Sequence, residues 1–407
     1  MTASVSSNFP LSAPEPSRMS FSGGRGDFLK MLIKGSLLQI PTFGFYRFWL
    51  NTKLRRHLWA NTQVEGEAFE YTGTAKELLI GFLIALAILA PLYIAYFIAA
   101  FMLEEQAPFA SIPLILVMYV LAHFGSYRAR KYRATRTVFR GVRFWMKGSG
   151  WAYAFRAILW DFATMLTLGL ALPWATASLE RYRMRHTYFG TIQGGFSGTG
   201  WTLFKRGWWI WALSLVALIG SFAVGFSLAD AYPEHKEAFA GTSPFLAIFL
   251  IMMLWPLLMT IFTRWHIDGL RFGDVVVTSN LRAGPVYGLF FKVLFSSIGF
   301  MLAFAVVCGI FVGVTALFFE GSMEALEAES SIAQFSAGIL VAVAYLAFLL
   351  GFGVIARYFF GRGLWAAVVT TTSVSNLPAL DAAVAAGQPS GVLGEGLADA
   401  LDFNAGI

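Results

Sequence analysis

The sequence predicts an all-α polytopic membrane protein with six full spans, two re-entrant or interfacial helical segments, short cytoplasmic β-hairpins and internal parallel repeats. Three observations support this fold class. Of the 407 residues, 57% are hydrophobic and only 13% are charged. Several apolar windows exceed the roughly 18 residues that indicate a membrane-spanning helix. Acidic and basic residues are also sorted into different segments between these windows.

Six apolar runs are long and uninterrupted, and each is a candidate span. Because an α-helix rises about 1.5 Å per residue, about 20 residues cross a hydrocarbon core roughly 30 Å thick. One of the runs contains Cys308. Because it is the single cysteine of the sequence, an intrachain disulfide is excluded. The six runs are residues 78–101, 109–126, 207–229, 244–263, 286–319 and 333–356.

Two further runs, residues 28–50 and 151–176, differ from the six. Each contains charged residues, among them Lys34 in the first and Asp161 in the second. Each is also interrupted near its middle by Gly or Pro beside Thr. These features predict segments that enter the membrane and turn back, since irregular backbone at membrane depth is tolerated only where protein or a water-filled cavity surrounds it.

The charges of the connecting segments favour this interpretation. The loops at residues 102–108, 230–243 and 320–332 are acidic, whereas the other segments hold 29 of the 30 Lys and Arg residues. If the two interrupted runs do not cross, all acidic loops fall on one side and the basic segments on the other, as the positive-inside rule requires. Both termini are then cytoplasmic. The alternative is eight spans with an unusual charge distribution.

The two interrupted runs are copies of each other. PTFGFYRFW at residues 41–49 corresponds, at a constant offset of 125, to LTLGLALPW at residues 166–174. The correspondence continues without a gap to Thr74 and Thr199, so it is an internal duplication. Each unit crosses the membrane an even number of times, and the repeats therefore run parallel.

Short extended segments lie between the helical runs. Residues 131–133 (KYR) align at an offset of 50 with residues 181–183 (RYR). Residues 64–71 and 267–272 each place a Gly a few positions before a Phe, which predicts β-hairpins with Gly at the turn. The resulting organisation is threefold, with two complete units and a third that lacks the re-entrant segment.

The predicted division of the chain follows from these runs. The Ser- and Pro-rich start has no apolar core like that of a signal peptide, so we expect no cleavage there, and its composition predicts disorder. The end of the chain is rich in Ala, Gly, Thr and Ser, which predicts a loosely ordered tail. The units are a disordered tail at residues 1–27, repeat unit 1 at 28–126, a basic hairpin segment at 127–150, repeat unit 2 at 151–263, unit 3 at 264–365 and a flexible tail at 366–407.

The motifs resemble a known family. Phe21 followed by Ser and Gly, then PTFGFYRFW, then LRRHLWANTQVEGEAFEYTGT at residues 54–74 and GVRF at 141–144, are similar to the YjgN family of bacterial inner-membrane proteins, which is defined by a domain of unknown function. The resemblance covers residues 20–365. It implies a multi-pass protein of the bacterial inner membrane. The family has no known activity and no established catalytic residues, so none is carried over to this sequence.

Six residues of the duplicated runs are candidates for a ligand site or a permeation pathway. A carboxylate inside an apolar run is costly and is usually functional or paired. Asp161 therefore forms an ion pair with Lys34 of the other copy, forms a local pair with Arg156, or lies at the level of the lipid headgroups. The glycines at the two predicted tips allow close backbone approach to a solute, although a simple helix kink explains them equally. The candidates are Lys34, Thr42, Gly44, Asp161, Thr167 and Gly169.

A basic cluster follows the second predicted span. It consists of Arg128, Arg130, Lys131, Arg133 and Arg136, and it either binds anionic lipid headgroups or only fixes the topology. No metal-ligand spacing, nucleotide-binding loop or catalytic triad stands out. We therefore expect no enzyme, no cofactor, no metal and no nucleic-acid partner.

The predicted function is that of a channel or transporter for a small anionic or amphiphilic solute. Gly- or Pro-interrupted segments at corresponding positions of two repeats indicate a midplane site. The alternative is a non-transporting scaffold or adaptor for a protein partner or anionic lipids. Membrane lipids are the expected partners, and a homo-oligomer or a membrane or cytoplasmic protein partner stays open.

Overall fold

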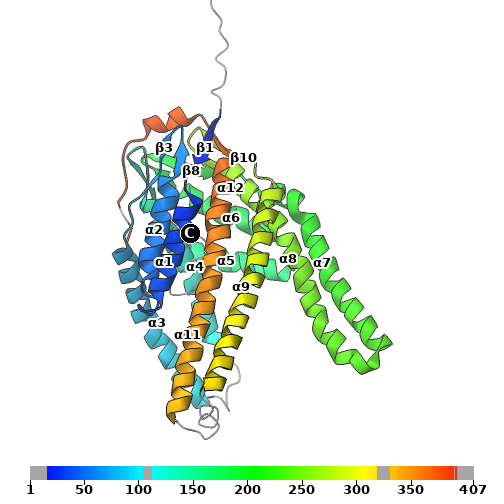
Figure 1. The fold of residues 1–407 in the computed structure, drawn as a ribbon. Coiled ribbons are helices and arrows are strands. Elements are labelled where there is room, and N and C mark those ends of the chain that lie inside the picture. Colours follow the sequence, from blue (N-terminus) through cyan, green and yellow to red (C-terminus); the bar gives the residue numbers. More distant parts are fainter. Residues whose placement is uncertain (1–15, 104–111, 319–330, 389, 392–407) are drawn as a thin grey trace, which may run out of the picture.

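The computed structural model describes residues 16–103, 112–318, 331–388 and 390–391. Within these ranges, long helices extend from one end of a compact sheet, and shorter helices fill the space next to it (Figure 1). The apolar composition is therefore concentrated in the helices. Their outward side chains include many large exposed hydrophobic residues, as expected where lipid replaces water.

Six helices of the described residues are long and apolar enough to cross a membrane. Each overlaps one of the six predicted spans, of which residues 109–111 and 319 lie outside the described residues, and the six candidate spans are confirmed at the level of helix length and composition. A 24-residue helix such as α4 extends about 36 Å, more than the roughly 30 Å of hydrocarbon. The six are α3 (Ala75–Leu103), α4 (Ile112–Thr135), α7 (Gly200–Ala231), α8 (Lys236–Gly269), α9 (Ala283–Phe318) and α11 (Ser331–Ala356).

Two smaller elements adjoin these helices. The 3-10 turn η1 (Pro233–His235) joins α7 to α8. At the end of α11 the chain continues as a π-helix, η2 (Arg357–Leu364), and then as α12 (Trp365–Thr370). The last span therefore reaches the sheet through a widened helical turn.

Each duplicated run folds as a pair of short helices joined by a tight turn. The pairs are α1 (Arg25–Gln39) with α2 (Arg47–Ala60), and α5 (Gly150–Leu166) with α6 (Leu172–Arg185). At 14 to 17 residues, each helix extends only about 21–26 Å and is shorter than the hydrocarbon core. The two helices of each pair pack against each other, so the chain reverses its direction.

The turns are built in the same way in both copies. The Thr42 hydroxyl donates to the Leu38 carbonyl at 2.7 Å and accepts from the Tyr46 amide at 3.1 Å. Thr167 repeats both bonds with Ala163 and Ala171, at 2.8 and 3.0 Å. Gly44 and Gly169 follow with φ of 83° and 90°, a region that favours glycine. The duplication read from the sequence therefore extends to individual hydrogen bonds.

The extended segments form a single antiparallel sheet of eleven strands rather than separate hairpins. The order is β3-β2-β1-β11-β10-β9-β8-β7-β6-β5-β4, and only Phe69 separates the terminal strands β3 and β4 in the chain. The sheet is thus an almost closed ring. The strands are β1 (Ser17–Phe21), β2 (Thr62–Val64), β3 (Glu67–Ala68), β4 (Glu70–Tyr71), β5 (Thr137–Phe139), β6 (Val142–Met146), β7 (Thr187–Phe189), β8 (Ile192–Phe196), β9 (Leu270–Phe272), β10 (Val275–Ser279) and β11 (Thr372–Ser375).

The pairing of the strands divides the chain into five copies of one structural unit, rather than the three units expected from the sequence. Each unit is a strand, two helical segments and a returning strand, and the two strands of a unit pair with each other: β1 with β2, β4 with β5, β6 with β7, β8 with β9 and β10 with β11. Turns connect successive units, and pairing of β1 with β11 closes the ring between the first and last. Three units contain long helices and two contain the short pairs.

A repeated threonine marks where a helix passes into a strand. Its hydroxyl donates to the carbonyl four residues earlier, which completes the last helical turn. The four instances are Thr62, Thr137, Thr187 and Thr372, with distances of 2.8, 3.0, 2.9 and 2.7 Å. The strands that follow are rich in β-branched and aromatic residues, which suit a pleated surface.

A hydrophobic core fills the ring. Val64, Phe139, Phe189, Val275 and Val374 come from five different strands and are almost fully buried together. Leu377, in the 3-10 helix η3 (Leu377–Ala382), packs into the same cluster from the C-terminal side. These strands belong to four of the five units, and Phe272 of β9, which packs against the cluster, adds the remaining unit. The core therefore joins all five units at one end of the molecule.

Several expectations need correction. Residues 17–21 and 372–375, which we placed in disordered or flexible tails, are β1 and β11. Residues 25–27 begin α1, residues 366–370 belong to α12, and residues 377–382 form η3. Of the two expected tails, residues 1–15, 389 and 392–407 lie outside the described residues. The hairpin glycine is confirmed at Gly66, with φ of 81°. In the other segment Gly269 ends α8, and the turn instead contains Gly273.

Candidate functional site

Asp161 contacts neither of the partners that the sequence suggested. Its carboxylate accepts a hydrogen bond from the Tyr119 hydroxyl and lies 2.9 Å from the Nε2 atom of His123. Both partners lie on α4, four residues apart and hence on one helix face. Lys34 is exposed and makes no ion pair within the described ranges. Asp161 therefore links α5 to α4 and does not link the two duplicated pairs.

The threonines and glycines at the two turns have structural roles. The hydroxyls of Thr42 and Thr167 are occupied by neighbouring backbone groups, as described above. Gly44 has open space around it, and Gly169 lies near the Trp211 indole, whose Nε1 donates to the Leu168 carbonyl at 2.9 Å. Their contact with a solute stays a prediction.

The basic cluster of α4 is engaged mainly inside the protein. Arg130 binds Glu180, and Arg136 lies 2.7 Å from the carboxylate of Glu77. Arg128 lies over the Phe124 ring, and Lys131 and Arg133 are partly buried. Arg130 and Arg136 are therefore parts of internal ion pairs rather than free ligands for lipid headgroups.

Glu180 is the centre of a buried network that sequence reasoning missed. Its side chain is 4% exposed and accepts two hydrogen bonds from Arg130, at 2.6 and 3.1 Å, and one from Arg183 at 3.0 Å. Burial alone would raise the pKa of this carboxyl. The nearby positive charges of Arg130, His266 and Arg183 outweigh it and lower the pKa to about 2. The sequence did contain a signal for this ion pair. The repeat offset of 50 places Arg130 and Glu180, which have opposite charges, at equivalent positions.

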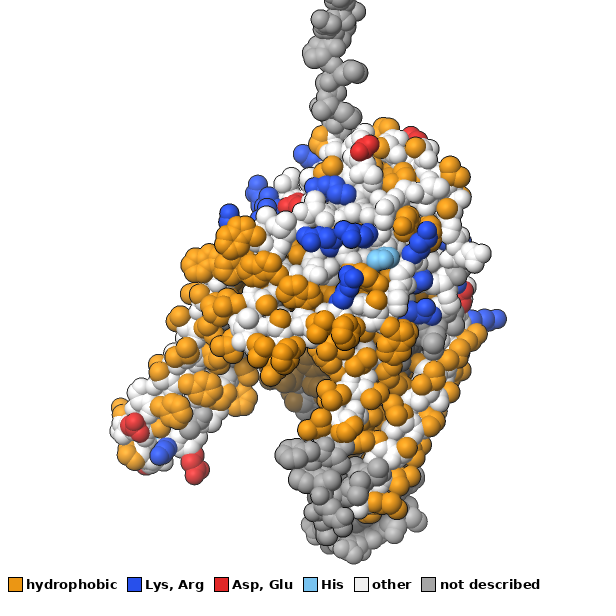
Figure 2. All heavy atoms as spheres, turned by 180° about the vertical axis from the view of Figure 1, so that it is seen from behind, with side chains coloured by type: hydrophobic (Ala, Val, Ile, Leu, Met, Phe, Trp, Pro, Cys, Tyr) orange, Lys and Arg blue, Asp and Glu red, His pale blue; other side chains and the backbone are white. Residues whose placement is uncertain are grey.

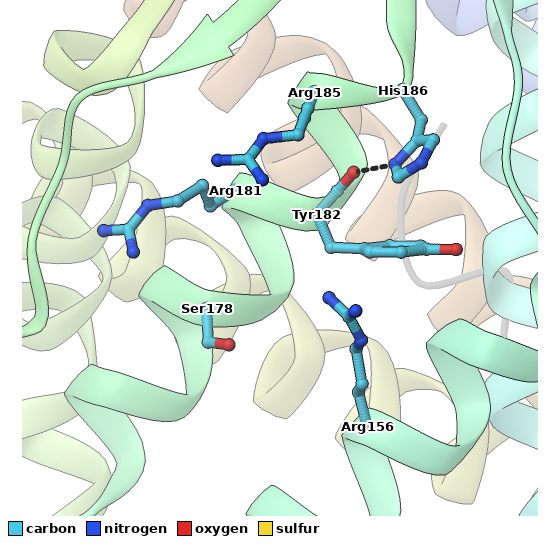
Figure 3. A pocket seen from close by; sticks show the side chains of 6 residues that line it. All are labelled: Arg156, Ser178, Arg181, Tyr182, Arg185 and His186. Carbon is cyan, nitrogen blue, oxygen red and sulfur yellow. Dashed lines mark hydrogen bonds between the residues drawn. The ribbon is translucent and has the colours of Figure 1, made fainter.

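A cationic pocket lies beside this network. It has a volume of about 480 Å³ and is lined by Arg156 of α5, by Ser178, Arg181, Tyr182 and Arg185 of α6, and by His186. In Figure 3 the Arg181 and Arg185 guanidinium groups extend to one side of Tyr182, and that of Arg156 lies below its ring. The Arg156 guanidinium carbon is 4.7 Å from the centre of that ring.

The three arginines are available to an anion. All three are exposed, no carboxylate lines the pocket, and none of the three forms an ion pair with another described residue. Arg181 donates to the Gly198 carbonyl at 3.4 Å, which fixes its position without neutralising it. Tyr182 is nearly buried, and its hydroxyl donates to the Ser149 carbonyl at 3.0 Å. Guanidinium groups on a rigid support suit phosphate or carboxylate oxygens.

The other end of the same helical pair is apolar. Met165, Leu166 and Leu168 at its turn are 74%, 67% and 76% exposed. Lys and Arg side chains form a band between the apolar helices and the sheet, and a hollow opens below that band (Figure 2). The α5–α6 pair thus has cations at its sheet-side end and exposed hydrophobic side chains at its tip. Across the described residues, no group of three His, Cys, Asp or Glu side chains could hold a metal ion.

Comparisons with known proteins agree with this membrane architecture. The sequence model of a family described as "Bacterial protein of unknown function (DUF898)" matches residues 16–243. Inner membrane protein YjgN of Escherichia coli (strain K12) is 29% identical over 151 residues, 35% of this chain and 36% of that protein. Its namesake in Escherichia coli O157:H7 is 30% identical over 150 residues, again 35% and 36% of the two chains.

A third relative extends the comparison to another genus. Inner membrane protein YjgN of Salmonella typhimurium is 25% identical over 138 residues, or 33% of each chain. The match therefore spans about a third of the length of these curated relatives. No solved structure matches the chain.

Proposed function

Because this chain belongs to the DUF898 family of bacterial proteins of unknown function, we propose that it is a multi-pass inner-membrane protein that binds an anionic amphiphile and moves it through the membrane. The inner membrane is the location given in the names of its relatives. The six long apolar helices support a multi-pass arrangement.

The sheet ring lies on the cytoplasmic side in this proposal, together with both termini. Lys and Arg side chains lie near the sheet in Figure 2, and acidic side chains lie at the far end of the α7–α8 pair. This distribution follows the positive-inside rule. The pairing of β1 with β11 supports a common side for the two ends of the described chain.

The two short helical pairs dip into the bilayer from the same side and return. Since all five units return to one sheet, each pair must cross the membrane an even number of times or not at all. The lengths of α1, α2, α5 and α6 favour partial entry, and so do the exposed apolar turns, where Phe43 is 91% and Leu168 76% exposed. The eight-span alternative would place parts of one sheet on opposite membrane faces.

One observation carries the ligand assignment: three arginines without carboxylate partners adjoin the exposed apolar surface of the same helical pair. An amphiphile would place its anionic head against Arg156, Arg181 and Arg185 and its tail along the hydrophobic tip. A free inorganic anion would use only the first half of this surface. An anionic phospholipid or a fatty acid would use both.

The route proposed for this amphiphile is lateral. A path along the axis of the ring would pass through the packed side chains of Val64, Phe139, Phe189 and Val275. The hollow that opens between the α7–α8 pair and the other helices (Figure 2) borders the α5–α6 pair, which contacts α7. An amphiphile entering from the bilayer would reach the arginines from there.

The test is the movement of fluorescent phosphatidylglycerol between leaflets of proteoliposomes, followed by quenching with an impermeant reductant. We expect transfer with the wild type and at least about tenfold slower transfer with the double variant Arg156→Gln, Arg181→Gln, because each lost charge-assisted contact weakens binding about tenfold. Arg56→Gln is the matched control. Arg56 is equivalent to Arg181 at the offset of 125 and donates to the Gly73 carbonyl at 2.9 Å, but it does not line the pocket. Equal transfer in all three proteins would refute the proposal.

A scaffold that only holds anionic lipid or a protein partner is the second candidate. A scaffold needs no path through the protein, and the packed core of the ring leaves none along the axis. Native mass spectrometry separates the two functions. Phosphatidylglycerol retained by the wild type and lost in the double variant, without any transfer between leaflets, would favour the scaffold.

A further inference from the structure

The π-helix η2 places a buried arginine where the last unit of the ring meets the first. Arg362 is 9% exposed, and one of its terminal nitrogens donates to the Gly23 carbonyl, just after β1. Its guanidinium carbon lies 5.4 Å from the centre of the Phe21 ring. π-Helical turns are rare and occur frequently at functional sites. Here the turn brings a positive charge to the seam between the last and first units, where β11 pairs with β1.

The charge of Arg362 is not compensated. No described carboxylate forms an ion pair with it, and its Nε atom is buried without a hydrogen-bond partner. An arginine side chain remains protonated in proteins, so burial cannot be relieved by losing the proton. A buried charge without a partner is strongly destabilising unless something in the native state neutralises it. The structure therefore calls for an anion at this position.

A cavity of about 490 Å³ opens next to Arg362. Its lining includes Phe21 and Arg25 from the first unit and Gly288, Lys292, Tyr358 and Arg362 from the last, with no Asp or Glu. Arg25 and Lys292 are exposed and have no ion pair among the described residues. Gly288 has nothing within 4 Å of the position that a Cβ would occupy, so the cavity is open beside it.

We propose that this cavity is a second anion site, which binds a phosphate group and so joins the first unit of the ring to the last. A phosphate in the cavity would lie beside the Arg362 guanidinium and be flanked by Arg25 and Lys292, three positive charges contributed from both sides of the seam. The apolar neighbours Phe21 and Tyr358 allow the phosphate to belong to a phospholipid or to be free. The site shares no residue with the α5–α6 pocket and does not rest on the proposed transport.

Binding to the folded state alone raises the unfolding temperature, and the rise grows with the logarithm of the ligand concentration once that concentration exceeds Kd. The full chain in nonionic detergent, freed of lipid, is therefore titrated with inorganic phosphate in one arm and with short-chain phosphatidylglycerol in the other. We expect one arm or both to raise Tm, and the apparent Kd to weaken about tenfold to a hundredfold in Arg362→Gln. A rise only with phosphatidylglycerol identifies a lipid phosphate, and a rise with inorganic phosphate identifies the free anion.

A pair of glycine variants makes the test independent of the stability of Arg362→Gln. Gly288→Leu fills the cavity without removing a charge and should abolish the rise in Tm. Gly284, one turn earlier on α9 and also in open space, is not a lining residue of the cavity, so Gly284→Leu should keep the rise in Tm. The proposal is overturned if neither ligand shifts the wild type. It is also overturned if Gly288→Leu responds as Gly284→Leu does.

Discussion

The guanidinium of Arg130 on α4 binds the carboxylate of Glu180 on α6 through two hydrogen bonds, although the two residues occupy equivalent positions of neighbouring units. The distances are 2.6 and 3.1 Å. One copy of the repeated unit has Arg at this position and the next copy has Glu. The opposite charges therefore connect the two neighbouring copies. Burial of Glu180 makes this contact sensitive to loss of either partner, because the remaining charge would be left without compensation.

The first prediction concerns that pair. Glu180→Gln should lower the free energy of unfolding by about 3–5 kcal/mol, the usual cost of breaking a buried ion pair from one side. The double variant Arg130→Gln, Glu180→Gln should be less destabilised than the sum of the two single variants, because the residues interact directly. Denaturant unfolding in detergent measures all three.

The matched control for this cycle is Glu65→Gln. Glu65 lies 3.4 Å from Arg140, and its side chain is 45% exposed. Exposed pairs contribute about 0–1 kcal/mol, so the control should remain close to the wild type. Strict additivity of the Arg130 and Glu180 substitutions would contradict the role assigned to their contact.

The second prediction is a loss of stability at acid pH. The pKa of Glu180 is about 2 in the folded protein against an ordinary value of 4.5. The carboxylate therefore stabilises the fold fully above about pH 4.5, and this contribution disappears as the pH falls towards 2. The difference corresponds to about 3 kcal/mol. Unfolding measured from pH 6 to pH 2 should show this decline in the wild type. Glu180→Gln should show a decline smaller by about that amount, and identical profiles would contradict the prediction.

The sequence predicted the helical part of this fold well because its signals are local. Six apolar runs and two Thr–Gly interruptions are visible without knowledge of any contact, and the hydrogen bonds of Thr42 and Thr167 lie within four residues. The turn at Gly44 also depends only on neighbouring backbone. The length and apolar pattern of each element therefore determined its type, and the duplication indicated that both turns would be alike.

The ring was not predictable in the same way. Its strands have two to five residues, too few for an alternating pattern to stand out, and β1 pairs with β11 across more than 350 residues of sequence. Both of these strands lie in polar segments that otherwise suggest disorder. The partners of Asp161 were missed for a related reason. Tyr119 and His123 reach it only through the packing of α4 on α5, which depends on the three-dimensional arrangement.

The third prediction concerns the two helical turns. A residue with a Cβ is strained by about 1–2 kcal/mol in the left-handed region, so Gly44→Ala and Gly169→Ala should each lower the free energy of unfolding by that amount. Gly220→Ala, in the interior of α7 with nothing within 4 Å, is the control and should be neutral or slightly stabilising. Thermal unfolding in detergent compares them. A Gly44 or Gly169 variant as stable as the control would show that the turn tolerates a different geometry.

The last prediction concerns the side of the membrane on which the ring lies. With Cys308 replaced by Ala, single cysteines are introduced at Glu65 and Ser197, which are exposed beside different turns of the sheet, at Leu168 on the α5–α6 tip, and at Glu237 near the start of α8. Glu65 and Ser197 should react with an impermeant thiol reagent only from the cytoplasmic side, because one sheet holds both segments. Glu237 should react only from the periplasmic side.

Leu168, with its side chain 76% exposed in the isolated chain, should resist the reagent from both sides of intact membranes and react in detergent, because lipid covers it. Periplasmic labelling of Ser197 with cytoplasmic labelling of Glu65 would mean that the 151–176 run crosses the bilayer, and the single ring could not then exist in the membrane.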